Sequence, residues 1–167
     1  MVVRRDVAAA RWWARGFARR AAGREARALK RLHDVESVPA LLAWDGRELL
    51  RSYIAGAPMQ QAKPRDRAFY AQALRLLVAL HRRGIVHNDL AKEPNWLVRA
   101  DGRPALVDFQ IAWTRGRRGR LFRMLAREDL RHLLKHKRTY CPEALTARQR
   151  RMLDTPALPS RVCRATG

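Results

Sequence analysis

The sequence has little cysteine, few acidic side chains and no long apolar run. Its two cysteines, Cys141 and Cys163, lack the paired spacing of a metal site, and a reducing cytoplasm suits them best. No apolar stretch approaches the roughly 18 residues that a membrane-spanning helix needs. The basic N-terminal residues are followed by more arginine and by tryptophan, which is unlike a signal peptide. We therefore expect neither a disulfide-stapled secreted domain nor a membrane-spanning protein.

Negative charge is scarce as well, because 15 Asp and Glu face 36 Lys and Arg and give a net charge of +21. Such a field concentrates anions at the surface. Nucleotide, nucleic acid, anionic lipid and phosphorylated glycan all fit it, and no specific nucleic-acid motif accompanies it. The hydrophobic share of 47% is enough for a core, and 167 residues predict one domain or two small lobes that share a cleft.

Two carboxylates, Asp89 and Asp108, each follow a short apolar segment. Between them, residues 101–102 read Asp-Gly, a hairpin turn signal that separates apolar segments at 96–98 and 105–107. Folding of that hairpin brings the loop of Asp89 back beside Asp108. The sequence therefore predicts two acids in one small volume.

The loop after Asp89 adds an ammonium and an amide, Lys92 and Asn95. Mg²⁺ prefers hard oxygen ligands and usually binds through one or two carboxylates and substrate phosphates. Asp108 and the amide oxygen of Asn95 are candidate ligands. Asp89 is then free to accept a hydrogen bond from an attacking hydroxyl, and Lys92 to neutralise charge on a transferred phosphoryl group. This set indicates Mg-nucleotide chemistry.

Residues 87–95 and 108–110 resemble the catalytic loop and metal-binding motif of protein-kinase-like enzymes. Within that superfamily they look most like small bacterial RIO-type serine/threonine kinases and lipopolysaccharide-core kinases. Two departures stand out. Asn95 lies one residue further from Asp89 than the family spacing, and Gln110 replaces the glycine of Asp-Phe-Gly, which suggests a loop held in one state.

The resemblance implies an α+β, protein-kinase-like, two-lobed fold. We expect a single domain over 1–167, with a reduced N-terminal lobe at 1–54 and a mainly helical C-terminal lobe at 55–167. The family's Gly-rich phosphate loop would precede the first strand, and the chain starts too late to contain it. Either the sequence is a truncated reading, or the protein is a reduced form with an open nucleotide site.

In the N-terminal lobe, the resemblance implies that Arg5, on a strand within 1–10, takes the place of the family's phosphate-holding lysine. The alternative is a solvated arginine on an edge strand. Glu25 shares the apolar stripe of a helix at 24–32, so its carboxylate points inward and needs a partner. The resemblance pairs Glu25 with Arg5, and the alternative is a bond to a neighbouring arginine.

Residues 11–23 mix aromatic and basic side chains, with Trp12, Trp13 and Phe17 among the arginines. A basic amphipathic helix of this kind can lie on an anionic membrane surface, which would place the protein at the periphery of the inner membrane. The alternative is that the three aromatic rings pack onto the small lobe. Packing is our expectation, because two glycines in the segment weaken a free helix.

Two strands, at 38–44 and 48–54, are expected on either side of an Asp-Gly turn. By resemblance, the segment 52–56 that follows is the hinge whose backbone meets adenine, and it carries the candidate cofactor-binding residues Tyr53 and Ile54.

Apolar spacing predicts a helix at 67–83, ended by Gly84, and another from 121 to about 140. Asp129 lies on the apolar face of the second helix. The resemblance implies that Asp129 bonds to the backbone of the 87–89 loop and fixes its shape. A partly exposed helix acid beside arginines is the alternative.

The predicted function is ATP-dependent phosphotransfer by a RIO-like serine/threonine kinase, with ATP and Mg²⁺ as cofactors. The acceptor is a hydroxyl, on a protein serine or threonine or on a lipopolysaccharide-core sugar. An alternative from another class is a non-catalytic kinase-like protein that binds membrane, glycan or nucleic acid through its basic face.

Overall fold

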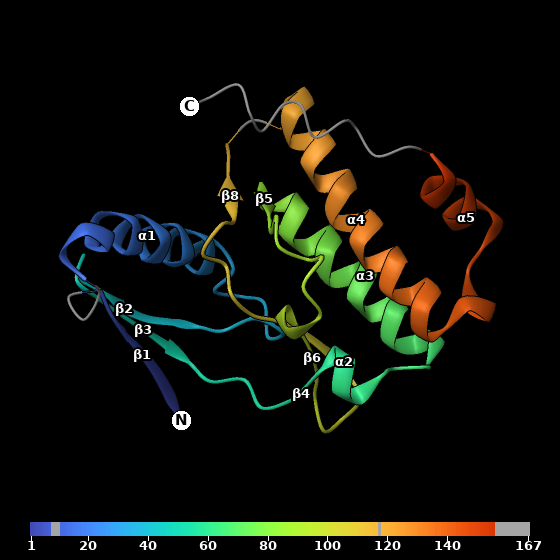
Figure 1. Cartoon of the computed structure of the whole chain (residues 1–167), viewed down its shortest axis with the longest axis horizontal. Helices are drawn as coiled ribbons and strands as arrows, with labels where there is room; N and C mark the ends of the chain where they lie inside the picture. Colours follow the sequence, from blue (N-terminus) through green and yellow to red (C-terminus); the bar gives the residue numbers. More distant parts are fainter. Residues whose placement is uncertain (8–10, 117, 156–167) are drawn as a thin grey trace.

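The chain forms a three-stranded sheet with one long helix on one side, joined to a larger and mainly helical part (Figure 1). The computed structural model describes residues 1–7, 11–116 and 118–155, so Cys163 lies outside the described residues. The α+β, two-lobed architecture expected from the sequence is confirmed, whereas the division into lobes at residue 54 stays a prediction.

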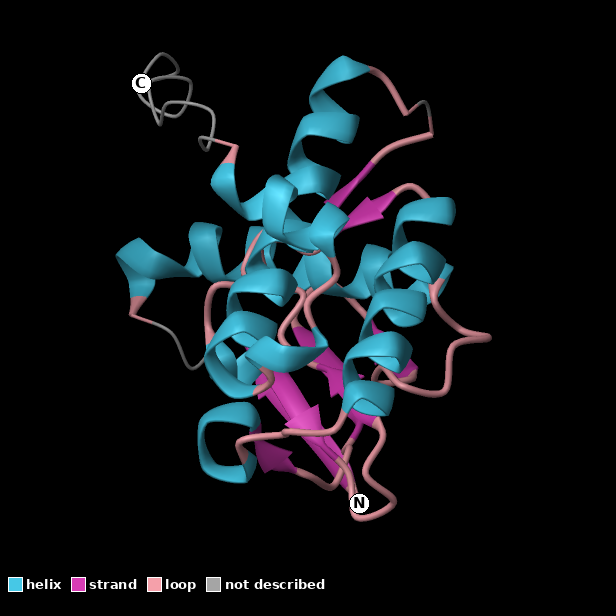
Figure 2. Cartoon of the chain, turned by 90° about the vertical axis from the view of Figure 1, so that its right-hand side faces the viewer, coloured by secondary structure: helices cyan, strands magenta, loops and turns pink. Residues whose placement is uncertain are grey.

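Within the described ranges, the strands form small antiparallel sheets in the orders β1-β3-β2, β4-β6-β7 and β5-β8. Figure 2 shows the β5–β8 pair well apart from the other strands. Their bounds are β1 Val2–Asp6, β2 Leu41–Trp44, β3 Glu48–Ser52, β4 Ala57–Pro58, β5 Ile85–Val86, β6 Trp96–Val98, β7 Pro104–Leu106 and β8 Trp113–Thr114.

The α-helices are α1 Arg15–Arg31, α2 Met59–Ala62, α3 Arg67–Arg82, α4 Arg120–Tyr140 and α5 Ala147–Asp154. The described residues also form short 3₁₀ helices, η1 Trp12–Ala14, η2 Glu93–Asn95 and η3 Pro142–Ala144. In the described part of the chain, no helix is long and apolar enough to cross a bilayer.

Helix α1 begins nine residues before the predicted start at residue 24 and runs through both of its glycines. Gly23 is buried, and a Cβ placed there would lie 3.8 Å from the ring of Trp44 on β2. Packing against the sheet therefore offsets the poor helix propensity of glycine.

The aromatic side chains of residues 11–23 do not pack as expected. Trp12, Trp13 and Phe17 are all exposed, and the buried face of α1 is made by small residues, Ala21, Ala22, Ala26 and Ala28, together with Leu29. Alanine lets the helix approach the sheet closely and leaves no cavity in which an indole ring would fit. The packing prediction for these rings was wrong.

The larger hydrophobic core extends through both lobes. It joins Ala28, Leu29 and Leu32 from the end of α1 to Leu77 of α3 and to Phe109, which follows β7. The end of α1 is thereby fixed to the helical lobe, and the segments that carry the predicted site residues are held on either side of this core.

Gly84 joins α3 to β5 with a φ of +71°, a conformation that favours glycine. A Cβ at this position would lie 2.1 Å from the carbonyl oxygen of Arg115. The predicted helix end is confirmed, and close approach of the chain after β8 adds a second reason for glycine.

Candidate active site

The loop between β5 and β6 brings Asp89, Lys92 and Asn95 together. Lys92 Nζ lies 2.8 Å from Asp89 Oδ2, and Asn95 Nδ2 donates to the same oxygen at 3.1 Å and to the Asp89 carbonyl at 2.9 Å. Lys92 is exposed, and its hydrogen bond to Asp89 raises the pKa of its ammonium. Asp89 therefore carries an acceptor oxygen at the open end of this loop, beside the ammonium group of Lys92.

The extra residue between Asp89 and Asn95 is taken up by the 3₁₀ turn η2, Glu93–Asn95. Pro94 within this turn presets a helical φ, and the Asn95 N–H donates to the Lys92 carbonyl at 3.2 Å. The Asn95 side chain is buried and still reaches Asp89. The longer spacing thus leaves the two side chains in contact.

Asp108 follows β7 and stands next to the same loop, because the Val107 N–H donates to the Asn95 carbonyl at 3.1 Å. Its φ of +65° lies in the left-handed region, which Asp and Asn tolerate better than most residues. The Asp108 Oδ1 atom is buried and has no hydrogen-bond partner among the described residues. A buried carboxylate oxygen without a partner is costly, so this atom is poised for a ligand.

Gln110 does not need the flexibility of the glycine it replaces. The described non-glycine residues with positive φ are Lys63, Asn88 and Asp108, and Gln110 is outside that set. The Ala112 N–H donates to the Phe109 carbonyl at 3.1 Å and closes a tight turn around Gln110. This turn is built with ordinary backbone conformations at its centre.

A divalent cation fits this arrangement. Asn95 uses its amide nitrogen on Asp89, which leaves its amide oxygen as a candidate ligand, and Asp108 Oδ1 is a second one. A backbone hydrogen bond from Val107 to the Asn95 carbonyl holds the two segments next to each other. The described residues contain no group of three or more His, Cys, Asp or Glu that could form a complete protein cage. Mg²⁺ does not need one, since it is usually held by one or two carboxylates together with substrate phosphates.

Arg5, on β1, and Glu25, on α1, form the predicted pair, with Arg5 Nη1 donating to Glu25 Oε2 at 3.1 Å. Arg51 of β3 adds a second ion pair, with its Nε 3.1 Å from Glu25 Oε1, although this contact lacks hydrogen-bond alignment. Burial raises the pKa of Glu25, the two arginines partly lower it, and the Asp108 carboxylate raises it again. Glu25 therefore lies within electrostatic reach of Asp108.

Helix α4 supports the loop that carries Asp89. The buried carboxylate of Asp129 accepts hydrogen bonds from the backbone N–H groups of His87 and Asn88, at 2.8 and 3.0 Å. His136 Nε2 lies 2.7 Å from the Leu90 carbonyl. This geometry confirms the first interpretation of Asp129, a carboxylate that fixes the backbone of the loop.

One turn beyond His136, Tyr140 donates its hydroxyl to Glu93 Oε2 at 2.7 Å. His81 of α3 approaches Asp129 from the other side, with Nε2 3.2 Å from Oδ2. The spacing of Asp129, His136 and Tyr140 places all three on one face of α4. The sequence analysis missed His136, Tyr140 and His81, because nothing in the local sequence marks a partner more than 40 residues away.

His87 joins the loop that carries Asp89 to the segment of Asp108. Its ring is buried, donates from Nε2 to the Val107 carbonyl at 3.0 Å and packs on Phe109 with ring centroids 4.7 Å apart. Nδ1 is buried with no partner among the described residues, which fixes the neutral tautomer. Burial lowers the pKa of His87, and the nearby Asp129 carboxylate only partly offsets this.

Stability should consequently fall at acidic pH. The folded-state pKa of His87 is below the unfolded value of 6.5, so its stabilising contribution is complete above pH 6.5 and is lost as the pH falls through the folded-state pKa. We expect the free energy of unfolding, measured with urea from pH 7.5 to 5.5, to fall by up to about 1.4 kcal/mol per pH unit from this group.

The slope should be smaller in His87→Gln, which keeps a donor for Val107. His33→Gln is the matched control, because the His33 side chain is exposed. A wild-type slope retained in full by His87→Gln would contradict the assignment of a neutral, buried His87.

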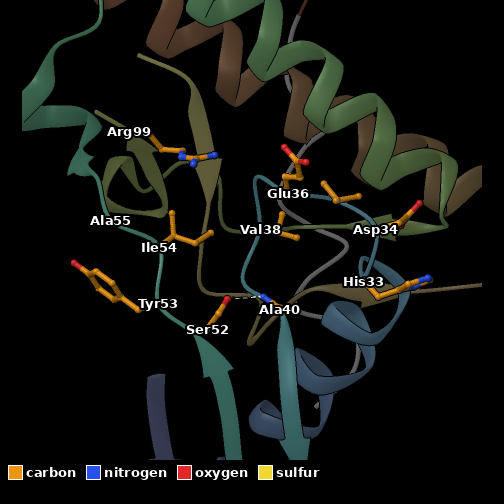
Figure 3. A pocket seen from close by; sticks show the side chains of 11 residues that line it. His33, Asp34, Glu36, Val38, Ala40, Ser52, Tyr53, Ile54, Ala55 and Arg99 are labelled. Atoms are coloured by element: carbon orange, nitrogen blue, oxygen red, sulfur yellow. Dashed lines mark hydrogen bonds between the residues drawn. The ribbon is translucent and has the colours of Figure 1, made fainter. Parts of the chain in front are cut away.

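The segment after β3 carries Tyr53 and Ile54, which project to opposite sides of the chain in Figure 3. The two residues line a cavity of about 430 Å³ together with the loop between α1 and β2, and no polar residue of the cluster around Asp89 and Asp108 lines it. The Tyr53 N–H donates to the Met1 carbonyl at 3.1 Å. The contact of Tyr53 and Ile54 with adenine stays a prediction.

The arrangement is that of a protein-kinase-like domain of the RIO type. A RIO domain family model matches residues 4–150, and the chain belongs to the RIO domain family. This confirms the resemblance to RIO-type kinases and supports a RIO-like kinase. A comparison with curated proteins found no match.

Two solved structures of similar fold come from Chaetomium thermophilum. The crystal structure of the Rio2 kinase aligns with a TM-score of 0.64 and 20% identity, over 86% of this chain and 47% of that chain. The Rio2 kinase–ADP/Mg²⁺–phosphoaspartate complex aligns with a TM-score of 0.62 and 20% identity, over 86% and 46%. This chain thus spans about half the length of those two proteins, and the kinase-like fold is confirmed.

Proposed function

We propose that this chain is a RIO-type kinase that transfers the γ-phosphoryl group of ATP to a hydroxyl, with Mg²⁺. The observation that carries the proposal is the unpaired, buried Oδ1 of Asp108 beside Asn95, whose amide nitrogen is already bound to Asp89. Asp108 and Asn95 would hold Mg²⁺, which when bound neutralises phosphate charge. The ADP and Mg²⁺ in the description of the similar Rio2 complex support this choice of cofactors.

Asp89 acts on the acceptor. The attacking hydroxyl oxygen forms a bond to the γ-phosphorus while the bond from that phosphorus to the bridging oxygen breaks, and ADP leaves. The proton of the hydroxyl passes to Asp89 Oδ2. Lys92, now paired with this oxygen, swings toward the migrating phosphoryl group, and its exposure gives it the freedom to do so.

Arg5 would contact the phosphates from the N-terminal sheet, with Glu25 fixing its guanidinium. Arg51 shares Glu25 and would hold the carboxylate when Arg5 turns toward ATP. Adenine would meet the backbone of Tyr53 and Ile54. Because the Tyr53 N–H already donates to the Met1 carbonyl, the Ile54 N–H would be the donor to adenine.

The acceptor is a protein serine or threonine or a lipopolysaccharide-core sugar, and the supply of ATP places the reaction in the cytoplasm. One of the similar structures is a phosphoaspartate complex of the Rio2 kinase. Products are therefore treated with hydroxylamine, which cleaves an acyl phosphate and spares a phosphate ester.

The non-catalytic alternative keeps the basic face as the functional surface and predicts no dependence on Mg²⁺.

Thermal unfolding with and without MgATP tests the proposal. At about 100 times its Kd, a ligand stabilises by roughly 2.7 kcal/mol, which is a rise in Tm of about 5–10 °C for a chain of this size. We expect this rise with MgATP and a smaller one with ATP and EDTA.

The Mg²⁺-dependent part should disappear in Asp108→Asn, which tolerates the left-handed backbone. Asp154→Asn, at the exposed end of α5, is the matched control and should keep the full rise. Equal Tm values with and without millimolar MgATP in the wild type would overturn the proposal and favour the non-catalytic alternative.

A further inference from the structure

The segment 12–17, at the start of α1, exposes three large aromatic side chains. Trp12 is 80% exposed, Trp13 is 67% and Phe17 is 74%. Trp12 and Trp13 lie in η1, which leads directly into α1, and Phe17 lies in the first turn of that helix. Three exposed aromatic rings within six residues indicate a contact surface, because exposed apolar residues are usually scattered singly over a protein surface.

Arginine continues the same face toward the end of the helix. Phe17, Arg20, Arg24 and Arg27 follow each other at intervals of three or four residues, so their side chains share one face. All four are exposed, and this face is opposite the buried stripe that contains Leu29. Helix α1 therefore has a buried apolar side and an exposed outer side. The outer side is aromatic at the start of the helix and cationic further along.

The cationic part is hollowed into a groove of about 630 Å³. Arg19, Arg20, Arg24 and Arg27 line it together with Trp44 of β2, and its described lining includes no carboxylate. The nearest turn carries Asp45, whose Oδ1 accepts hydrogen bonds from two backbone N–H groups of its own turn. The groove thus presents guanidinium groups to an anionic partner.

Together the two features favour a bilayer over a soluble polyanion. A nucleic acid or polyphosphate would engage the arginines and leave Trp12, Trp13 and Phe17 in water. At a bilayer surface, tryptophan and phenylalanine enter the boundary between headgroups and acyl chains, while arginine pairs with anionic headgroups. Figure 1 places this end of α1 on the opposite side of the molecule from α5, where the helical lobe does not cover it.

We propose that the outer face of α1 docks the protein on an anionic phospholipid bilayer. Trp12, Trp13 and Phe17 enter the interface, and Arg20, Arg24 and Arg27 pair with headgroup phosphates. This attachment is independent of the proposed phosphotransfer, since it uses no residue of the cluster around Asp89 and Asp108.

Co-sedimentation with vesicles tests the proposal on the full chain. The wild type should bind phosphatidylcholine vesicles that contain phosphatidylglycerol, and bind pure phosphatidylcholine vesicles far more weakly. Removal of one arginine charge should weaken binding about fivefold, so Arg20→Gln/Arg24→Gln should lose roughly 25-fold. Trp12→Ser/Trp13→Ser/Phe17→Ser should lose more than about tenfold, because apolar burial also contributes to the affinity.

The matched control is Arg148→Gln/Arg151→Gln, which removes two exposed arginines from α5 and should bind as the wild type does. Circular dichroism and Tm establish that each variant is folded. Wild-type tryptophan fluorescence supplies a readout that needs no variant, because lipids brominated near the headgroup should quench it.

Several results would overturn the proposal. Equal losses in the α1 and α5 variants would show that only net charge matters, and vesicle binding without any quenching would show that the rings stay in water. Binding of RNA or inorganic polyphosphate in preference to the anionic vesicles would identify a polyanion site. Conversion of a dimer to a monomer by the triple serine variant, without lipid binding, would identify an interface between copies.

Discussion

Replacement of Asp129 by alanine should lower Tm by about 10 °C. The carboxylate is buried and accepts hydrogen bonds from the backbone N–H groups of His87 and Asn88 and a contact from His81. Alanine leaves these donors without a partner. Removal of one side of a buried charged network costs about 3–5 kcal/mol, and each kcal/mol shifts Tm by about 2–4 °C for a chain of this length.

Two further variants make the measurement specific. Asp129→Asn keeps one acceptor oxygen, so its Tm should fall between those of the wild type and Asp129→Ala. Glu128→Ala removes a neighbouring, half-buried carboxylate that lies 3.5 Å from Arg131 Nε. It should change Tm by only a few degrees, because the Arg131 guanidinium keeps its hydrogen bonds to the Met152 and Thr155 carbonyls. If the melting temperatures of Asp129→Ala and Glu128→Ala were equal, the role assigned to Asp129 would be wrong.

Replacement of Asp89 by asparagine should reduce phosphotransfer about 10²- to 10⁴-fold, the range that general-base catalysis contributes. Asparagine keeps the size of the side chain but cannot take the proton of the attacking hydroxyl. The rate is measured as ADP release and as phosphate incorporated into a protein acceptor and into core oligosaccharide, which separates the two acceptor classes.

Nucleotide binding separates this effect from misfolding. Asp89 is bonded to Lys92 and Asn95 and is not one of the proposed metal ligands, so Asp89→Asn should keep the Mg²⁺-dependent rise in Tm. Asp101→Asn, at the exposed hairpin turn, is the control for loss of a surface carboxylate. A wild-type rate in Asp89→Asn would exclude Asp89 as the base.

Much of the candidate site could be predicted because its parts are close in sequence. Asp89, Lys92 and Asn95 share one loop, and the Asp-Gly turn returns the chain to Asp108 within 13 residues of Asn95. The helical spacing of Glu25 with Ala28, Leu29 and Leu32 gave the inward orientation of Glu25. The family resemblance supplied Arg5 as its partner.

What the sequence did not reveal depends on long-range packing. Arg51 reaches Glu25 only because β3 pairs with β1 in a register that places it beside Val3. His136 reaches the Leu90 carbonyl only because α4, which comes much later in the sequence, packs against this loop. The exposure of Trp12 was mispredicted because a list of apolar residues does not show whether a matching cavity exists, and here alanines fill the interface.

The support that α4 gives the loop of Asp89 has a consequence for nucleotide affinity under the proposed function. A loop tied to Asp129, His136 and Tyr140 has few other conformations to populate, so ATP would not need to select a rare state. If a substitution in α4 left the loop in its present conformation only about a tenth of the time, the apparent Kd would rise about tenfold with every nucleotide contact intact. Substitutions in α4 that weaken this support would therefore lower nucleotide affinity without any contact with the nucleotide.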